Sequence, residues 1–546
     1  MFERQDAHTI VLVILATLAT ALAREGLAFD MPYLDFSVVV RAPSFLENSV
    51  EQLFVTMLSC IFLFWLLHTL YSFLRLRQYP VPKGCKDPPR LIGAWIPFVG
   101  SGPELSKDSI AFVEKYHKSH GDVFQTKIGL FSAYFVKDVH FAVSVVSRQP
   151  KIYSFHEYFG LLTVRLFNIS IDGHKLDSMH RWTHKHLTGE NLHNFTNRFS
   201  SNVRNAFQEK AMSMQEFQVV NLFNFSNPLV FDTAIRAFFG NYDLSLEAKR
   251  ICQETLVYDD FFVKMLSGLV PEMLMKRQRK AQYLVGNYLV TALQPDAMTD
   301  LARDLFSMLD CYKKSDVAFL FAWALSANSL PTIFWMVLFL LRNNKTREQV
   351  MAQVYDVLKT ETGWDAATAT EFPVLSADVI KKMTLMKSFM WETLRRRSSV
   401  NITRMLTEDT VVTLGEERFF LRKGNLVICT NPHHDPSVFP EPETVVADRF
   451  LDKKNHVDSK GKRISLPNMS FGHGISLCPG RHFALMEGPA MAIMMLACFD
   501  WKPISPEASE PPPCYEKFGF GCMPLYTDYQ EDPSVYFQVR VKPQFL

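Results

Sequence analysis

The most prominent pattern in the chain is an apolar run near its amino end. Residues 53–74 read LFVTMLSCIFLFWLLHTLYSFL, which is 22 residues without Asp, Glu, Lys or Arg. At about 1.5 Å per residue, a helix of this length crosses the roughly 30 Å apolar core of a bilayer. Four basic residues follow within residues 75–86, whereas residues 24–52 contain only two. This bias predicts a transmembrane helix with the rest of the chain in the cytosol.

A second apolar run lies closer to the amino end. Residues 9–23 form a stretch of 15 that is short for a membrane span and ends in small residues, as a signal-peptidase site does. The sequence leaves open whether this stretch spans the membrane or is cleaved, and both alternatives leave the main body cytosolic. Residues 1–78 are therefore predicted to be a membrane-targeting region with an anchor of one or two passes.

A segment rich in proline and glycine, residues 79–103, follows this region. Proline fixes its own backbone and restricts the preceding residue, so we expect a stiff hinge. Residues 104–546 form the main body, and most of residues 105–400 has helical patterning. Residues 407–430 change to short runs of β-forming residues that are broken at glycines. We predict a body that is mainly α-helical with small β-sheets.

One stretch of the body, residues 316–342, is almost wholly apolar over the length of a long helix. By composition alone it could be taken for another membrane span. Asn328 and Pro331 stand near its middle together with two serines, and proline interrupts helical hydrogen bonding. The pattern therefore indicates a core helix with a break.

The composition narrows the functional classes. Hydrophobic residues make up 48% of the 546 residues and charged residues 21%, which is typical of a globular chain. The formal net charge of +2 argues against nucleic acid as a partner. The 46 phenylalanines fit either core packing or an apolar cavity. The nine cysteines are scattered singly without a CxxC pair, which argues against a zinc ribbon or a disulfide framework.

One cysteine has distinctive surroundings. Residues 471–480 read FGHGISLCPG, and their three glycines let the backbone approach a flat group closely. A thiolate at Cys478 can accept backbone N–H bonds and bind a soft metal. A helix-like run begins directly after this segment, and its positive end would favour the negative charge. The plain alternative is a glycine-rich turn with a buried cysteine.

The order F-x-x-G-x-x-x-C-x-G, with Phe471, Gly474, Cys478 and Gly480 at its fixed positions, matches the haem loop of the cytochrome P450s. The chain resembles this family over most of its length. The resemblance implies a haem-thiolate fold, haem b with an axial thiolate from Cys478, and contacts from these four residues to the cofactor. It also implies electrons from NADPH through NADPH–cytochrome P450 reductase, and an anchor in the endoplasmic reticulum membrane.

Two further motifs extend the resemblance. Glu392 and Arg395 resemble the family's E-x-x-R helix, where the i,i+3 spacing puts both charges on one helix face. Arg449 lies in a segment that resembles the family's meander, which supplies a second arginine. By resemblance these three residues form a buried cluster of charges and hydrogen bonds that is structural and not catalytic.

The resemblance also gives candidate partners for the haem propionates. Arg404 stands where the family usually keeps a propionate arginine. Trp182 and His186 have the spacing of the family's W-x-x-x-R helix, with histidine in place of arginine. Ser476 stands where many members have another arginine. We therefore expect Arg404, Trp182 and His186 near the cofactor, with anchoring of the propionates open at two of three points.

The segment expected beside the iron departs from the usual pattern. Family members that activate oxygen usually carry A/G-G-x-D/E-T, but residues 327–332 read ANSLPT, with leucine at the acid position and proline at the threonine position. This resembles the subgroup of cholesterol 7α-hydroxylase, sterol 12α-hydroxylase and prostacyclin synthase, as does the FGFGCM run at residues 518–523. We expect Asn328 to bind substrate or water, and Ser329 or Thr332 to relay protons. The alternative is that these polar groups merely satisfy the broken helix.

The leading hypothesis is a monooxygenase that inserts one oxygen atom from O2 into an apolar lipid such as a sterol or a terpenoid. The substrate class rests on analogy with the subgroup. A second hypothesis is an isomerase or dehydratase of a peroxide-like substrate, because prostacyclin synthase shares the Asn-x-x-Pro pattern. A non-catalytic haem protein is a third, less favoured because no second axial ligand is evident.

Overall fold

The computed structural model describes residues 56–57, 59–60, 62–63, 66–67, 80–89, 100–129, 131–240, 247–266, 270–398, 401–451, 456–458, 461–465, 468–505 and 533–545. The chain divides into two compact units, Met1–Pro80 and Val81–Leu546. The predicted run at residues 9–23 and the FGFGCM segment lie outside the described residues. Eight residues of the predicted span 53–74 are described, and all eight are helical.

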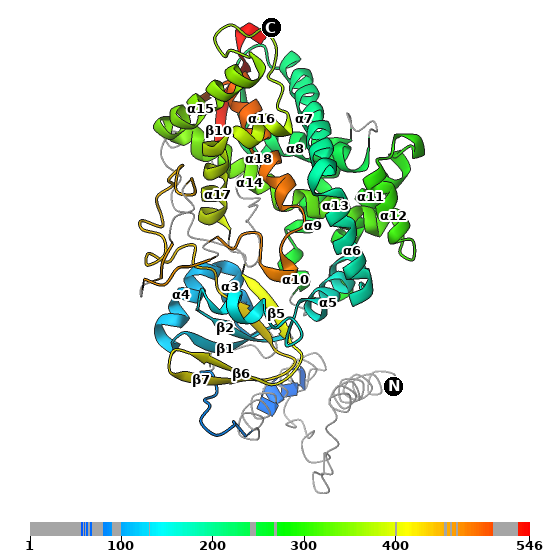
Figure 1. Ribbon diagram of the computed structural model, residues 1–546. Coiled ribbons are helices and arrows are strands. Elements are labelled where there is room, and N and C mark those ends of the chain that lie inside the picture. The colour runs from blue at the N-terminus through cyan, green and yellow to red at the C-terminus, as the bar shows by residue number, and fades with distance from the viewer. Residues whose placement is uncertain are drawn as a thin grey trace, which may run out of the picture. The chain divides into compact units, whose positions relative to one another are not determined.

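The second unit is mainly helical, as the sequence predicts. Its helices are α3 (Gly102–Lys107), α4 (Ser109–His120), α5 (Phe155–Phe167), α6 (Gly173–His186), α7 (Gly189–Met212), α8 (Leu222–Phe239), α9 (Ala248–Asp259), α10 (Phe262–Leu266), α11 (Lys276–Ala292), α12 (Asp300–Met308), α13 (Lys314–Ser326), α14 (Ser329–Arg342), α15 (Asn344–Thr362), α16 (Ala377–Lys382), α17 (Thr384–Arg397) and α18 (Arg481–Cys498). In Figure 1 most of these helices gather on one side of the unit, away from β1, β2, β5, β6 and β7.

Among the described residues, the strands are short and form three sheets. They are β1 (Val123–Ile128), β2 (Phe131–Val136), β3 (Tyr153–Ser154), β4 (Gln218–Asn221), β5 (Ile402–Leu406), β6 (Thr410–Leu414), β7 (Glu417–Leu421), β8 (Leu426–Cys429), β9 (Phe499–Pro503) and β10 (Tyr536–Val541). The largest sheet has the order β1-β2-β8-β5-β3, in which β2 and β8 are parallel and the other neighbours are antiparallel. The β-rich pattern at residues 407–430 is confirmed as the β6–β7 hairpin and β8, and Gly415 turns the hairpin at a φ of 60°.

The apolar stretch at residues 316–342 is a broken core helix, as predicted. It forms α13 and α14, and the break lies at Ala327 and Asn328. These two helices together are long and apolar enough to cross a membrane, but most of their length is buried inside the protein. Every residue of α14 from Leu330 to Arg342 is buried, as expected of a helix that is hydrophobic all round.

The helix break has a local cause that positions the site. Pro331 is the third residue of α14, where a backbone N–H has no intrahelical acceptor in any case, so proline is tolerated there. Proline in the middle of a continuous helix would instead remove a hydrogen bond and clash with the preceding turn. The chain therefore starts a new helix at Ser329, and α14 packs against α8, α17 and α18.

Candidate active site

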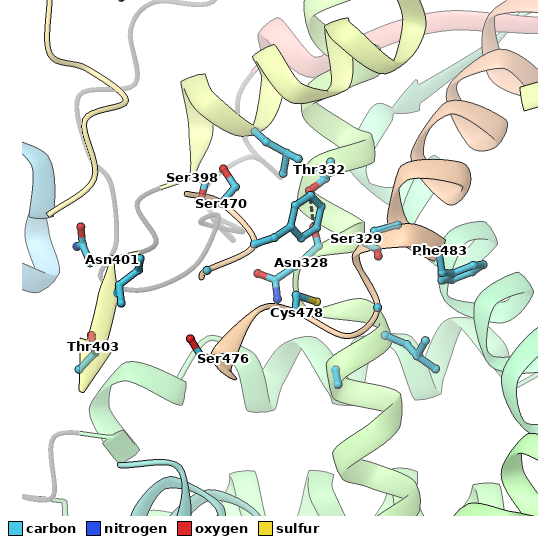
Figure 2. Close-up of a pocket in the computed structure, with 18 of the residues that line it drawn as sticks. Asn328, Ser329, Thr332, Ser398, Asn401, Thr403, Ser470, Ser476, Cys478 and Phe483 are labelled. Atoms are coloured by element: carbon cyan, nitrogen blue, oxygen red, sulfur yellow. Dashed lines mark hydrogen bonds between the residues drawn. The ribbon is translucent and has the colours of Figure 1, made fainter. Parts of the chain in front are cut away.

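A cavity of about 390 Å³ lies where α14, α17, α18, α5 and β5 meet the segment at residues 470–480. This volume is in the range of small-molecule and cofactor sites, about 300–1,000 Å³. Its wall is mostly apolar, with contributions from Leu162, Leu266, Ile333 and Leu394. Figure 2 shows the polar side chains on this wall, which include those of Asn328 and Cys478. Cys478 and the helix break at Asn328, which are 150 residues apart in the sequence, thus line the same cavity.

The loop before α18 holds Cys478 at the cavity. The Cys478 N–H donates to the Phe471 carbonyl at 2.8 Å, which closes the loop. Burial raises the pKa of the Cys478 thiol, whereas hydrogen bonds from the backbone N–H groups of Gly480 and Arg481 lower it. These two groups belong to the amino end of α18, where the helix dipole favours negative charge on the sulfur. Burial is the larger effect, so the pKa of the thiol lies above its ordinary value, and the donors at the start of α18 offset part of that rise.

Two glycines in this loop have the left-handed backbone that glycine favours. Gly472 has a φ of 73° and Gly474 a φ of 64°. A Cβ on Gly474 would lie 2.9 Å from Ser147 Oγ, so a side chain at this position would clash as well as strain the backbone. Because Gly474 has no side chain, the loop can pack closely against Ser147. Phe471 and Gly480, like Cys478, line the cavity itself.

The residues at the helix break line the cavity from the opposite element. Asn328, Ser329 and Thr332 all lie on its wall. The Thr332 hydroxyl donates to the Asn328 carbonyl at 2.6 Å, which satisfies the broken turn. The Asn328 side chain is therefore the better placed of the two predicted residues to meet a molecule in the cavity. For Thr332, the bond to Asn328 fits the structural alternative.

A buried glutamate, Glu487, also lines this cavity, and it belongs to none of the sequence motifs described above. Glu487 lies in α18 and is 1% exposed. Ser329 Oγ donates to Glu487 Oε2 at 2.6 Å, a bond between residues 158 positions apart. Burial raises the pKa of Glu487 to about 8, while the bond from Ser329 lowers it. In the sequence, this residue could have been found as a lone glutamate inside an otherwise apolar helical run, which indicates a buried carboxyl group.

Arg404 approaches the cavity from β5. It is 2% exposed, and its Nη2 donates to Ser476 Oγ at 2.6 Å and to the His473 carbonyl at 3.0 Å. Burial lowers the pKa of Arg404 to about 10, which leaves it charged at neutral pH. Its Nε and the hydroxyl of Ser470 are buried without a partner among the described residues. An anion in the cavity would satisfy both groups.

Trp182 and His186, predicted near the cofactor, lie on α6 and are not among the residues that line this cavity. Trp182 Nε1 donates to the Leu301 carbonyl at 3.2 Å. His186 Nε2 lies 2.9 Å from Asp304 Oδ2. Both side chains are thus engaged with α12. His186 has a protein carboxylate as its partner, so Arg404 is the better-placed cation for an anionic group in the cavity.

The predicted charge cluster forms beside the site. Glu392 and Arg395 are fully buried in α17, and Arg395 Nε donates to Glu392 Oε2 at 2.8 Å. Arg449 Nε donates to the other oxygen, Oε1, at 3.0 Å. Arg395 Nη1 also donates to the His433 carbonyl at 2.7 Å. The cluster joins α17 to the segment around residues 433–449 and does not line the cavity, which fits a structural role.

Comparison with known proteins agrees with this geometry. Residues 313–529, which contain α14, the charge cluster and the Cys478 loop, match the family model of cytochrome P450. These residues form a cytochrome P450 domain. The chain is therefore an oxidoreductase of the P450 monooxygenase type, and the family holds haem through a cysteine thiolate.

Relatives of the chain include members of the expected subgroup of P450s. The chain is 26% identical to cytochrome P450 7B1 of Mus musculus over 436 residues, which is 76% of this chain and 84% of that protein. It is 26% identical to the 5-beta-cholestane-3-alpha,7-alpha-diol 12-alpha-hydroxylase of Sus scrofa, covering 84% and 94% of the two chains. Prostacyclin synthase of Rattus norvegicus is 24% identical, with 83% and 94% covered.

A solved structure shares the fold. The retinoic acid-bound cyanobacterial CYP120A1 matches with a TM-score of 0.61 at 18% identity, over 84% of this chain and 99% of that chain. The mainly helical P450 fold with small sheets is thus confirmed.

The residues present fit a haem. Cys478 supplies the sulfur ligand, and the loop donors favour its thiolate form. The unpartnered Nε of Arg404 and hydroxyl of Ser470 suit the two propionates, which need donors. Ser476, which replaces an arginine found in many P450s, accepts a bond from Arg404 and so orients the remaining arginine.

Proposed function

We propose that this P450 inserts one oxygen atom from O2 into an apolar lipid, with a sterol as the favoured class. The observation that carries the proposal is the mostly apolar cavity that Cys478 and the Asn328 helix break line from two different elements. The substrate class follows from the relatives named as cholestane and cholestenone 12-alpha-hydroxylases and cytochrome P450 7A1. A substrate of this kind contributes apolar surface, and its burial drives binding.

Haem bound through Cys478 would supply oxygen activation, which electron donation from the thiolate favours. The chain's own residues provide the surroundings for this chemistry. Ile333 and Leu394 exclude water from the reacting face. The amide of Asn328 offers a donor and an acceptor, and it orients a hydroxyl of the substrate or an ordered water. Arg404 holds an anionic edge of the cofactor.

The electrons would come from NADPH through NADPH–cytochrome P450 reductase, since the reaction needs two electrons per turnover that the substrate does not supply. The apolar run at residues 53–74 would anchor the chain in the endoplasmic reticulum membrane. A membrane-dissolved substrate would then reach the cavity without crossing water.

The proposal is tested with the full chain expressed in membranes together with the reductase. A panel of sterols is supplied under ¹⁸O-labelled oxygen, with and without NADPH, and products are analysed by mass spectrometry. The expected result is an NADPH-dependent product that carries one labelled atom. A Cys478→Ser variant serves as the matched control, because it keeps the size of the side chain and loses the thiolate ligand.

A second reaction class has one observation in its favour. Prostacyclin synthase is among the relatives. The Asn-x-x-Pro pattern of this chain, which resembles that of the subgroup, places Asn328 and Pro331 at the break. An isomerase of a peroxide-like substrate needs neither NADPH nor delivered protons. Conversion of a lipid peroxide without NADPH and without label would refute the monooxygenase proposal and favour this class.

A further inference from the structure

His433 is a fully buried histidine beside the charge cluster. Its exposed fraction is 0%, and it follows β8 in the chain. Burial lowers the pKa of His433 to about 3, so its ring is uncharged at neutral pH. A neutral imidazole has one N–H donor and one acceptor nitrogen, and inside a protein each of them needs a partner.

Both ring nitrogens of His433 meet a backbone group. Nδ1 lies 3.2 Å from the carbonyl oxygen of Ser398, the residue directly after α17. The Met469 N–H donates to Nε2 at 2.9 Å. Since a carbonyl oxygen only accepts and a backbone N–H only donates, the proton is on Nδ1 and the lone pair is on Nε2. The ring thus joins the carboxyl end of α17 to the segment around Met469.

This segment leads into the cysteine loop, residues 471–480. The Gly472 N–H donates to the Met469 carbonyl at 2.8 Å, and the Cys478 N–H donates to the Phe471 carbonyl at 2.8 Å. Phe471 and Gly472 also line the active-site cavity. The position of Met469 therefore sets where the loop begins, and with it the position of the carbonyl that closes the loop at Cys478.

The charge cluster holds His433 from its backbone. Arg395 Nη1 donates to the His433 carbonyl at 2.7 Å, and the His433 N–H donates to Asn431 Oδ1 at 3.2 Å. Arg395 is itself held by Glu392. A continuous series of hydrogen bonds thus runs from Glu392 through Arg395 and His433 to Met469, and it connects the buried charges with the start of the cysteine loop.

We propose that His433 is a positioning residue for the haem site, whose Nε2 holds the Met469 N–H and so fixes the loop that presents Cys478. The proposal rests on haem ligation by Cys478. Groups behind a metal ligand commonly set the position of that ligand. Met469 has an exposed fraction of 0%, so water cannot replace the acceptor if Nε2 is lost. The segment would then move towards another acceptor, and the Phe471 carbonyl would move with it.

Two substitutions of His433 separate its two bonds. Nδ1 is two covalent bonds from Cβ, as the amide atoms of asparagine are, and Nε2 is three bonds away, as the amide atoms of glutamine are. His433→Asn therefore keeps a donor for the Ser398 carbonyl and loses the acceptor for the Met469 N–H. His433→Gln keeps the acceptor and loses the bond to Ser398. Both variants remove the ring, so the loss of packing is common to them.

His117 provides a matched control. It is 7% exposed, and its Nδ1 lies 2.9 Å from the Gly121 carbonyl oxygen. Burial lowers the pKa of His117 to about 4, so this ring is also uncharged at neutral pH. Its Nε2 has no partner among the described residues, and the residue lies on α4, away from the active-site cavity. His117→Asn thus removes the same part of a buried ring without removing an acceptor that is in use.

The experiment uses the full-length holoprotein in detergent and measures two properties besides turnover. These are the absorption of the reduced CO complex and the rate of haem transfer to apomyoglobin. We expect His433→Asn to transfer haem about ten-fold faster than the wild type and to lose thiolate-type absorption, because a buried donor is left without an acceptor. His433→Gln and His117→Asn should both keep the absorption and the transfer rate of the wild type.

Amide hydrogen exchange, resolved to Met469 by fragmentation and mass spectrometry, tests the same bond without haem chemistry. The Met469 amide should exchange slowly in the wild type and in His433→Gln, and fast in His433→Asn. The wild-type measurement does not depend on the folding of any variant, and fast exchange there would overturn the proposal. Wild-type absorption and haem transfer in His433→Asn would also overturn it, as would an equal loss in His433→Gln.

Failure of the haem ligation itself gives a different result. In that case the wild type lacks thiolate-type absorption while the Met469 amide still exchanges slowly, and the positioning role falls together with the ligand assignment. Loss of absorption in His117→Asn as well would overturn the proposal, since it would show that removal of any buried histidine ring has this effect.

Discussion

The buried charge cluster allows a quantitative prediction. Glu392 accepts four hydrogen bonds, from Arg395 Nε at 2.8 Å, Arg395 Nη2 at 2.9 Å, Arg449 Nε at 3.0 Å and the Val446 N–H at 3.0 Å. Neither Glu392 nor Arg395 has any side-chain exposure, so water cannot replace a lost partner. We predict that Glu392→Gln strongly destabilises the folded protein.

The magnitude follows from these contacts. If the glutamine oxygen takes the place of Oε1, its amide nitrogen faces Arg395 Nε, and two donors meet. Loss of one charged hydrogen bond costs about 1.5–3 kcal/mol. The guanidinium of Arg395 also stays buried without a counter-charge, and breaking a buried pair in this way costs about 3–5 kcal/mol in all. This is about two to four powers of ten in the ratio of folded to unfolded protein.

The assay is pulse proteolysis of the holoprotein in detergent over a urea series, with the same excess of free haem throughout. This method reports the fraction of unfolded chain, and constant haem removes differences in cofactor binding. Arg250→Ala is the control, because Arg250 and Glu247 form an i,i+3 pair that is 61% and 37% exposed. An exposed pair of this kind contributes about 0–1 kcal/mol. A Glu392→Gln loss no larger than that of the control would refute the reasoning.

Four further predictions follow. Cys478→Ser should abolish the thiolate-type absorption of the reduced CO complex, and an unchanged spectrum would sink the ligand assignment. Arg404→Ala should weaken haem retention, because Arg404 has an unpartnered buried Nε at the cavity. The rate of haem transfer to apomyoglobin measures this. Retention equal to that of the wild type would contradict the role of Arg404 in holding the cofactor. Gly286→Ala should destabilise the protein by about 1–3 kcal/mol, since a Cβ there would lie 2.1 Å from the Ser315 carbonyl oxygen and would push α11 from α13. Thermal unfolding followed by circular dichroism measures this loss. An unchanged melting temperature would argue against the close approach of the two helices. Burial lowers the pKa of His433 from 6.5 to about 3, so the unfolded chain binds a proton as the pH falls below 6.5 while the native chain does not. Stability should thus fall by about 2 kcal/mol from pH 6.5 to 5 through this residue, and His433→Gln should flatten that slope in urea titrations at both pH values.

The sequence determined the parts of this protein that depend on neighbours along the chain. The i,i+3 spacing of Glu392 and Arg395 puts both on one face of α17, whatever the rest of the fold does. Pro331 predicts the break in the long apolar helix, because proline is tolerated in the first turn of a helix and not in its middle. The glycines around Cys478 predict the loop that approaches the cofactor, since their backbone conformation is disfavoured for other residues.

Tertiary structure decided which distant side chains meet. Nothing near Ser329 in the sequence points to Glu487, and nothing near His186 points to Asp304, yet each pair forms a hydrogen bond across packed helices. The same packing removes water from Glu487 and so sets its protonation, which a residue type alone does not define. Periodicity tells which face of a helix is buried, but the partner on the other side depends on how the helices pack, and that arrangement is a property of the whole fold.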